Sequence, residues 1–386
     1  MELAGTEVPV VWRGRRVSAF VPQLLVERDL SLDAKTASRC GAAAAGVSQG
    51  AEALSDEYVP LARLLLRAEG IASSYIEGVT APVVDVVIAE HNDSVRTPAA
   101  WVAANMAAAD EAIAHASGKE PLSVEELCRW HEALMAGSPA PARYVGCIRD
   151  EQGWIGSPTP FEAHLVTPPA ATLDGLLADL LTFVNGADLD PIAAAAIAHA
   201  QFEIIHPFAD GNGRIGRVLI SWLLTRRLYL LTPPPVSVRL AADVGGYTAG
   251  LTQYRFGQTN SWVAWFADAV SGASRAQQQL VGDVGRIRAG WEQKLSGYGR
   301  VRSLRSDASA WRVLDLLPSH LVLTTPAVVS ALGLTRPAAG TALRTLADAG
   351  ILTPYPAAAP SRTGRPAQLF VSEELLGLAV SSPLRR

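Results

Sequence analysis

The most informative stretch of the 386-residue sequence is twelve residues long, from His206 to Arg217, and its residue types suit the handling of a phosphate. Gly211 and Gly213 let the backbone approach a ligand closely where a helix begins, and the free N–H groups of a helix start bind anions. Arg214 and Arg217 lie three residues apart, on one face of that helix, where they can reach different oxygens of a polyphosphate. The spacing therefore predicts an anion site.

The same stretch holds groups that could bind a metal and move a proton. Asp210 offers a hard oxygen ligand, which suits a Mg²⁺ ion that bridges two phosphates. His206 has an ordinary pKa that lets it take a proton from a hydroxyl nucleophile near neutral pH. The alternative is a plain helix–loop–helix turn, in which Gly, Asn212 and Asp only satisfy turn geometry. That alternative does not require a histidine and two spaced arginines.

Two apolar segments are expected to position this stretch. Asp190 and Pro191 are a capping residue and a first-turn proline, so they predict a helix start, and an alanine-rich run carries that helix to residue 205. Apolar residues at helical spacing predict a second helix over residues 214–226. The polar stretch is thus expected between two buried helices.

The pattern His-x-Phe-x-Asp/Glu-Gly-Asn-Gly-Arg-x-x-Arg resembles the signature of Fic-domain proteins, and every specified position is filled. The resemblance implies a mainly α fold, a Fic-type helical bundle with a β-hairpin flap. It also implies transfer of AMP from ATP, with Mg²⁺, to a Ser, Thr or Tyr hydroxyl of a target protein or of the enzyme itself. The implied roles are His206 as general base, Phe208 as core anchor, Asp210 as metal ligand, Gly211, Asn212 and Gly213 as the anion hole, and Arg214 and Arg217 as ligands of the β- and γ-phosphates. Because Fic relatives also transfer phosphate or phosphocholine, another phosphate-containing group is the alternative.

A second motif lies upstream, at Ser73, Glu77 and Gly78. Taken alone, it is typical of a helix end, with Gly78 just beyond the helix and Glu77 in solvent. It is also similar to the inhibitory motif Ser/Thr-x-x-x-Glu-Gly/Asn of Fic proteins. The resemblance implies that Glu77 pairs with Arg217, removes its phosphate contact and repels the phosphate. We therefore expect autoinhibition by Glu77.

Two strand-like runs, 144–148 and 154–156, flank residues 150–153 and predict a hairpin. A simple connector is the alternative, but the hairpin resembles the Fic flap, which holds a target peptide by backbone pairing. The family pattern also places an aromatic residue near the adenine. Tyr247 or Tyr254 could serve, and a core position is the alternative for both.

The C-terminal part is expected to be a separate unit. Helices over 325–333 and 336–349, followed by strands that begin at residues 350 and 368, resemble a winged helix-turn-helix domain. Residues 300–386 hold ten arginines and five acidic residues, which favours DNA. The predicted DNA contacts are Arg336, Arg344, Arg362 and Arg365. Protein contact or formation of a homodimer is the alternative use of this domain.

Length and composition complete the expectations. The predicted division is 1–95 (N-terminal arm and helical region with the inhibitory motif), 96–270 (Fic catalytic domain), 271–304 (linking helix) and 305–386 (winged helix). Three widely spaced cysteines favour a reducing, cytoplasmic location. The uncharged run 316–335 contains prolines and other polar breaks, so no membrane segment is expected. A DNA-binding regulator with an inactive Fic domain is a further alternative, which the complete signature disfavours.

Overall fold

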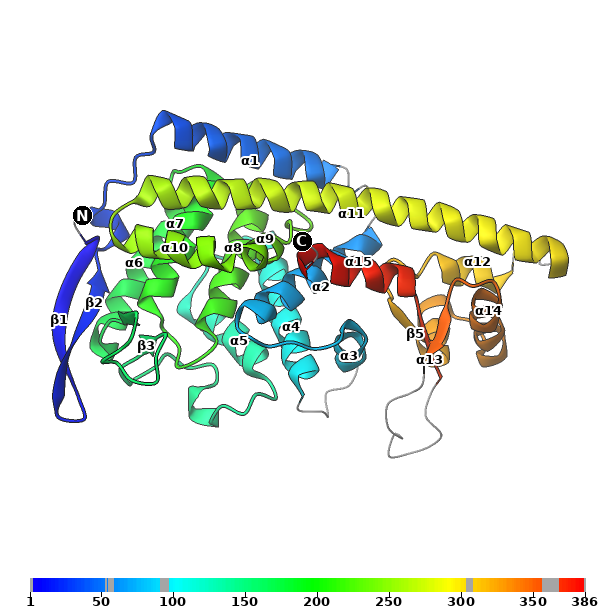
Figure 1. The fold of residues 1–386 in the computed structure, drawn as a ribbon, viewed down its shortest axis with the longest axis horizontal. Coiled ribbons are helices and arrows are strands. Elements are labelled where there is room, and N and C mark those ends of the chain that lie inside the picture. Colours follow the sequence, from blue (N-terminus) through cyan, green and yellow to red (C-terminus); the bar gives the residue numbers. More distant parts are fainter. Residues whose placement is uncertain are drawn as a thin grey trace.

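The computed structural model describes residues 3–52, 54, 59–90, 97–302, 308–355 and 368–384. The fold is mainly helical, as the sequence predicts, and elongated (Figure 1). A helical body holds the His206–Arg217 stretch, and a smaller unit built from the C-terminal residues lies at the other end. The helix α11 (Thr259–Arg302) has 44 residues and runs along both, without a break at the predicted boundary after residue 270. At about 1.5 Å per residue it is roughly 66 Å long.

The core of the body is built around the helix α7. The other helices of the body are α1 (Ala34–Glu52), α2 (Val59–Ile76), α3 (Val83–Ala89), α4 (Pro98–Ser117), α5 (Val124–Met135), α6 (Leu173–Gly186), α8 (Asn212–Leu228), α9 (Val236–Ala242) and α10 (Val244–Arg255). All of α7 (Pro191–Ile205) except Pro191 and Glu203 is buried, and its alanines let neighbouring helices pack closely. The Asp190 carboxylate accepts hydrogen bonds from the N–H groups of Ile192 and Ala193, so the predicted cap is confirmed.

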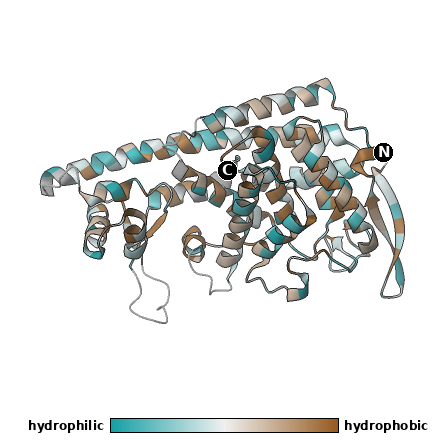
Figure 2. Cartoon of the chain, turned by 180° about the vertical axis from the view of Figure 1, so that it is seen from behind, coloured by the Kyte–Doolittle hydropathy of each residue, from teal (hydrophilic) through white to brown (hydrophobic). Residues whose placement is uncertain are grey.

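The helices α1 and α11 lie side by side on the outside of the body. Along α1 the buried residues recur every three or four positions, as expected for an amphipathic helix: Thr36, Cys40, Ala43, Val47 and Gly50. Hydrophobic and hydrophilic residues accordingly alternate along both helices (Figure 2). None of the described helices is long and apolar enough to cross a membrane.

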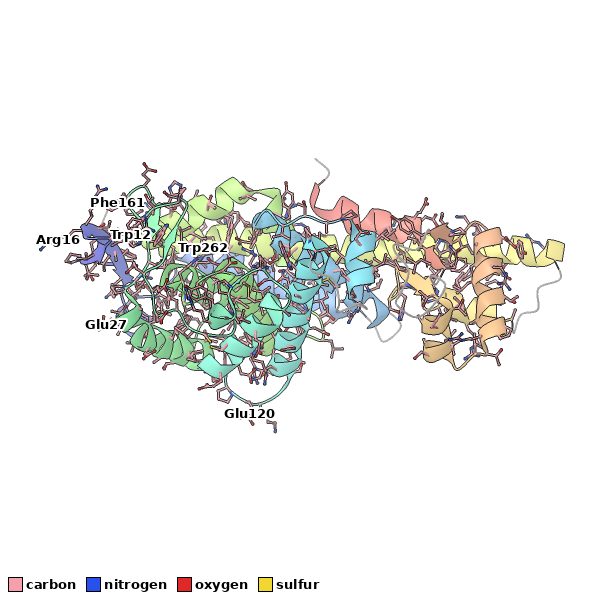
Figure 3. The ribbon with its side chains drawn as sticks, turned by 90° about the horizontal axis from the view of Figure 1, so that it is seen from below. Trp12, Arg16, Glu27, Glu120, Phe161 and Trp262 are labelled. Atoms are coloured by element: carbon pink, nitrogen blue, oxygen red, sulfur yellow. The ribbon has the colours of Figure 1, made fainter. Side chains whose placement is uncertain are left out.

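A β-hairpin projects from the N-terminal end of the body (Figure 1). Its strands β1 (Gly5–Trp12) and β2 (Arg15–Pro22) are antiparallel, with Trp12 opposite Arg15. Arg13 and Gly14 both have positive φ, 48° and 76°, which is the conformation that tight two-residue hairpin turns require. In a view from below, Trp12 and Phe161 lie at this same end of the molecule (Figure 3).

The flap is a hairpin, but its strands differ from the predicted ones. Strand β3 (Trp154–Ile155) pairs with β4 (Leu165–Val166), whereas the predicted run 144–148 forms no strand and begins in a 3-10 turn (Ala142–Tyr144). The prediction was wrong because the backbone of this run bonds elsewhere. The N–H of Gly146 donates to the ring of His131, and the N–H of Arg149 donates to the carbonyl of Pro207.

The C-terminal unit contains the predicted helix–turn–helix and strands in the predicted order. Its elements are α12 (Ser309–Leu314), β5 (Val322–Thr324), α13 (Thr325–Leu332), α14 (Arg336–Asp348), β6 (Thr353–Tyr355), β7 (Leu369–Val371) and α15 (Glu373–Leu384). The three strands form an antiparallel sheet in the order β5-β7-β6. Thr324 and Thr335 cap α13 and α14. The predicted contacts Arg362 and Arg365 lie outside the described residues.

The helix α2 belongs to both parts of the molecule. Its first half contributes Leu61 and Leu64 to the apolar core of the C-terminal unit, where Leu317, Leu321 and Leu323 also lie. In the same half, the buried Arg67 pairs with Glu90 at 2.7 Å and donates a hydrogen bond to the carbonyl of Ser319. The second half of α2 packs Ala68 and Ala72 against α9. Its backbone and Ser73 accept hydrogen bonds from Asn105 on α4 and Arg217 on α8. One rigid element thus joins the two parts.

Candidate functional site

The His206–Arg217 stretch forms a tight loop between α7 and α8. His206 ends α7 in the left-handed region (φ 50°, ψ 60°), and Gly211 precedes α8 with φ 77°. The Asn212 side chain closes the loop, because it accepts from the N–H of Phe208 (2.8 Å) and donates to its carbonyl (2.7 Å). The side chain of Asn212 therefore shapes the loop, while its backbone N–H lies at the start of α8.

His131, on α5, packs against the loop and is hydrogen-bonded to it. Its Nδ1 accepts a hydrogen bond from the N–H of Gly146 (2.9 Å), so the proton resides on Nε2, which donates to the carbonyl of Asp210 (3.0 Å). Its ring stacks on Phe208 with centroids 4.0 Å apart. Burial lowers the pKa of His131, which keeps the ring neutral. Phe208 is fully buried, in agreement with its implied role as an anchor.

His206 is placed to act as a base. Its Nδ1 lies 3.3 Å from the carbonyl oxygen of Glu203 and donates to it, which leaves the lone pair on Nε2. Burial lowers the pKa of His206 to about 4, and the nearby Arg149 acts in the same direction. The imidazole is therefore neutral at pH 7 and can accept a proton.

Two arginines converge at the start of α8. Arg214 is only 7% exposed, and its Nε is buried with no hydrogen-bond partner within the described part of the chain. Arg217 is 1% exposed and donates from Nε to Ser73 Oγ (2.9 Å) and from Nη2 to the Ser73 carbonyl (2.9 Å). A buried guanidinium with an unused N–H is expected to bind an anion, because leaving it unpaired is costly.

The second motif lies directly against this arginine pair. Glu77 Oε1 is 2.8 Å from Arg217 Nη2, so the predicted pairing is present. Gly78 has φ 75° and lies just beyond α2, as the sequence predicts for a helix end. A methyl group at Gly213 would overlap the Glu77 carboxylate in its present position, so glycine leaves room for this contact.

Asp210 is the one predicted metal ligand. Its side chain is exposed, and its Oδ1 accepts a hydrogen bond from the N–H of Gly211 (2.7 Å). The described residues contain no group of three or more His, Cys, Asp or Glu side chains that could hold a metal. A single carboxylate nevertheless fits Mg²⁺ in a nucleotide site, where phosphate and water oxygens complete the coordination.

Arg149 is a site residue that the sequence analysis missed. Although only 5% exposed, it donates to four carbonyl oxygens. Nε donates to His206 (2.8 Å), Nη1 to Glu151 (2.7 Å), and Nη2 to Pro168 (2.7 Å) and Ile205 (3.4 Å). It thus fastens the His206 loop to both ends of the flap. Nothing in the local sequence signals this role, since all the acceptors are backbone atoms.

Tyr247 is buried in the apolar core of the body. Its hydroxyl lies 2.8 Å from Nε2 of the buried His199, and its ring stacks on His199 and on Trp265. Tyr254 is also buried and donates from its hydroxyl to Gln201 (3.0 Å). Both tyrosines therefore occupy core positions, and an adenine contact by Tyr247 would require its ring to be uncovered. Beside them, burial raises the pKa of Glu203 to about 7.

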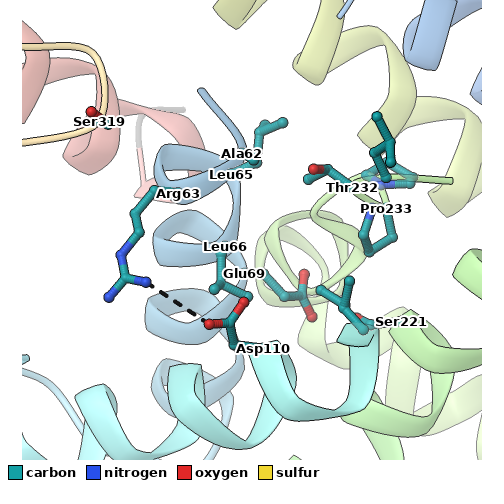
Figure 4. Close-up of a pocket in the computed structure, with 13 residues that line it drawn as sticks. Ala62, Arg63, Leu65, Leu66, Glu69, Asp110, Ser221, Thr232, Pro233 and Ser319 are labelled. Atoms are coloured by element: carbon teal, nitrogen blue, oxygen red, sulfur yellow. Dashed lines mark ion pairs between the residues drawn. The ribbon is translucent and has the colours of Figure 1, made fainter. Parts of the chain in front are cut away.

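A cavity of about 400 Å³ lies between α2, α4, α8 and residues 231–234 (Figure 4). Its lining includes Glu69, one helical turn before Ser73 on α2, and Ser221, one turn after Arg217 on α8. The Glu69 carboxylate accepts from the N–H (2.8 Å) and the hydroxyl of Ser237, and burial raises its pKa to about 7. The cavity is distinct from the loop that carries His206.

Comparisons with known proteins agree with this geometry. The sequence pattern of the Fic/DOC family matches residues 121–224. "Protein adenylyltransferase fic-1" of Caenorhabditis briggsae is 31% identical over 134 residues, which cover 35% of this chain and 25% of that protein. "Probable protein adenylyltransferase aq_aa38" of Aquifex aeolicus is 33% identical over 108 residues, 28% of this chain and 31% of that protein. The chain thus spans about a quarter to a third of these relatives' length.

Solved structures show the same fold. A Fic family protein from Desulfovibrio desulfuricans has a TM-score of 0.53 at 22% identity, over 89% of this chain and 97% of that one. A Fic domain containing signaling protein from Bacteroides thetaiotaomicron has a TM-score of 0.51 at 16% identity, over 63% of this chain and 96% of that one. Residues 121–224 thus match the Fic/DOC family pattern, and the fold resembles that of these Fic family structures.

Proposed function

We propose that the protein transfers AMP from ATP to a hydroxyl group of a protein target or of itself. The observation that carries the proposal is the neutral His206 imidazole, whose Nε2 lone pair has no partner among the described residues, next to the first turn of α8, where the buried Nε of Arg214 is unpaired. A base and an anion site side by side are what transfer from a triphosphate to a hydroxyl requires. Both relatives are named as protein adenylyltransferases, which supports the same activity.

In the proposed reaction the target hydroxyl oxygen attacks the α-phosphorus, and its proton passes to His206 Nε2. The bond between the α-phosphorus and the bridging oxygen breaks, so pyrophosphate leaves. Arg214 and the N–H groups at the start of α8 neutralise the charge that develops on the leaving group. Asp210 would hold Mg²⁺, which would add further positive charge beside the phosphates.

We further propose that Glu77 holds this activity back. As long as Glu77 occupies Arg217 Nη2, that guanidinium cannot bind the γ-phosphate, and the carboxylate repels the triphosphate. ATP would then bind without the geometry for transfer.

The test is to incubate the protein with Mg²⁺ and ATP labelled at either the α- or the γ-phosphate. Wild type, Glu77→Gly and Glu77→Gly/His206→Ala are compared. We expect covalent α-label that is strongest in Glu77→Gly and absent once His206 is replaced. Label from the γ-position alone would favour phosphoryl transfer, and no label from either position would contradict the proposal.

A second function is proposed for the C-terminal unit, as a winged helix that binds DNA. Arg336 and Arg344 are exposed on α14, whereas Leu343 and Leu346 on the same helix are buried. A basic outer face on the second helix of a helix–turn–helix is typical of DNA readers. In a mobility-shift assay with random-sequence duplex DNA, Arg344→Ala is expected to weaken binding and lower its salt dependence. Self-association instead of a DNA shift would favour a dimer contact.

A further inference from the structure

We propose that the tip of the N-terminal hairpin and the adjacent flap form one surface that binds an acidic, extended segment of the target protein. This hairpin–flap surface consists of Trp12, Arg13, Arg15, Arg16, Phe161 and Arg255. The proposal rests on the proposed function, because it names the class of protein substrate that is presented at the flap.

Aromatic contacts join the hairpin to the flap. The ring of Trp12 packs edge-to-face on Trp154 (centroids 5.5 Å apart) and on Phe161 (5.6 Å). Strand β2 also contacts β4. Among the described strands β3 pairs with β4 alone, so a peptide that adds to the flap at β3 passes beside Trp154. The hairpin tip is therefore part of the wall that such a peptide meets.

Two arginine side chains at the hairpin tip stack on aromatic rings. The Arg15 guanidinium lies 3.9 Å from the centroid of Phe161, and that of Arg13 lies 4.5 Å from Trp12. Within the described ranges, neither of them nor Arg16 forms an ion pair with Asp or Glu, and all three are exposed. A guanidinium stacked on a ring keeps its N–H edges outward, where they match a carboxylate.

A groove of about 470 Å³ lies between the hairpin and the flap, and its lining residues, most of them apolar, include two arginines. Arg16 and Arg255 line it together with Glu7, whose carboxylate already accepts a hydrogen bond from Ser18 (2.9 Å). Arg255 Nη1 donates to the carbonyl of His164 (2.8 Å), but its Nε is buried and has no partner among the described atoms. The groove thus offers unused N–H donors and a surplus of positive charge.

These features select the kind of partner. Two ring-stacked guanidinium groups at the hairpin tip, with two more in the groove beside β4, favour a ligand that provides both carboxylates and an extended backbone. An acidic protein segment provides both, whereas a nucleic acid provides only the charge. Arginine and tryptophan are also the side chains that most often dominate the binding energy of protein interfaces.

The test measures peptide binding by fluorescence anisotropy, without ATP. Three dye-labelled twelve-residue peptides each carry one threonine, flanked by glutamates, by Gly and Ser, or by lysines. We expect the full-length protein to bind the acidic peptide at least tenfold more tightly than the neutral one. Arg13→Glu/Arg15→Glu should abolish that preference, while Arg275→Glu, an exposed arginine on α11, should leave it unchanged.

Several outcomes would overturn the proposal: equal affinity for acidic and neutral peptides, no binding up to millimolar peptide, or a preference that survives the charge reversal. Displacement of the peptide by a lower concentration of single-stranded RNA would assign the surface to nucleic acid. If the charge reversal lowers the melting temperature, Arg13→Gln/Arg15→Gln replaces it. The binding assay can also be run with His206→Ala, because it does not depend on transfer. A failure of label transfer would therefore refute the proposed activity and leave the peptide-binding result valid.

Discussion

The carboxylate of Glu77 and the guanidinium of Arg217 form a very unequal pair. Their nearest atoms are 2.8 Å apart, yet the Glu77 side chain is 39% exposed and that of Arg217 only 1%. Ser73 holds Arg217 through two further hydrogen bonds, so the arginine would stay in place if the glutamate left. Removal of Glu77 therefore leaves a pre-positioned cation and opens no apolar surface.

The first prediction concerns this pair. In Glu77→Gly the rate of labelling from α-labelled ATP is expected to rise at least tenfold, because Arg217 becomes available to phosphate. Glu77→Gln, which keeps the size and removes the charge, should give an intermediate rate. Because Arg217 is buried and loses its carboxylate partner, the free energy of unfolding should also fall, by roughly 1–3 kcal/mol. An unchanged rate in both would remove Glu77 from the regulation of this site.

The second prediction concerns the pH dependence of transfer in the Glu77→Gly background. The neutral form of His206 acts as the base, and it is lost only as the pH falls through its lowered pKa of about 4. The single-turnover rate should therefore hold from pH 8 down to about pH 5, although an ordinary histidine becomes protonated as the pH falls below about 6.5. Glu203, with a pKa raised to about 7, is the control: Glu203→Gln should remove any inflection near pH 7. A rate that halves near pH 6.5 both in Glu77→Gly and in Glu77→Gly/Glu203→Gln would contradict the assignment.

The third prediction concerns Arg149. Arg149→Met leaves several buried carbonyls without a donor, each at a cost of about 1–3 kcal/mol, so a strong loss of stability is expected. Arg149→Lys keeps a donor and should retain more of the stability measured by urea unfolding. Both variants should transfer AMP to a target more slowly, because the flap and the His206 loop are no longer fastened together. Normal target labelling by a folded Arg149→Lys protein would show that the fastening is unnecessary.

The fourth prediction links Glu69 to the pH dependence of stability. Its pKa is raised from 4.5 to about 7 in the folded protein, so between these values the unfolded chain binds fewer protons than the folded one. The free energy of unfolding contributed by Glu69 must fall as the pH rises through this window, by up to about 3 kcal/mol. The difference in stability between wild type and Glu69→Gln should therefore shift in favour of the variant from pH 4.5 to 7.5. A constant difference would indicate an ordinary carboxyl group.

Whether a feature could be predicted from the sequence depended on how far apart in the chain the interacting residues lie. The cap at Asp190, the turn after Ile205 and the two helices around Gly333 are encoded by neighbouring residues, and all were predicted. The pairing of Ser73 and Glu77 with Arg217 was inferred from a family pattern, since about 140 residues separate the partners. By contrast, the partner strand of β3 and the four acceptors of Arg149 follow from tertiary packing, and no local pattern announces them.

Because α2 contributes to both apolar cores, the C-terminal unit cannot be exchanged freely between related chains. A chain cut before residue 303 would expose Leu61, Leu64, Val83 and Val87, which now pack with the C-terminal unit. It would also remove the hydrogen bond from Arg67 to the carbonyl of Ser319. Arg67 lies about two helical turns before Ser73 on α2. The C-terminal unit therefore cannot simply be removed. A domain that replaces it would need a matching apolar surface along α2, because α2 would otherwise shift and misplace Glu77.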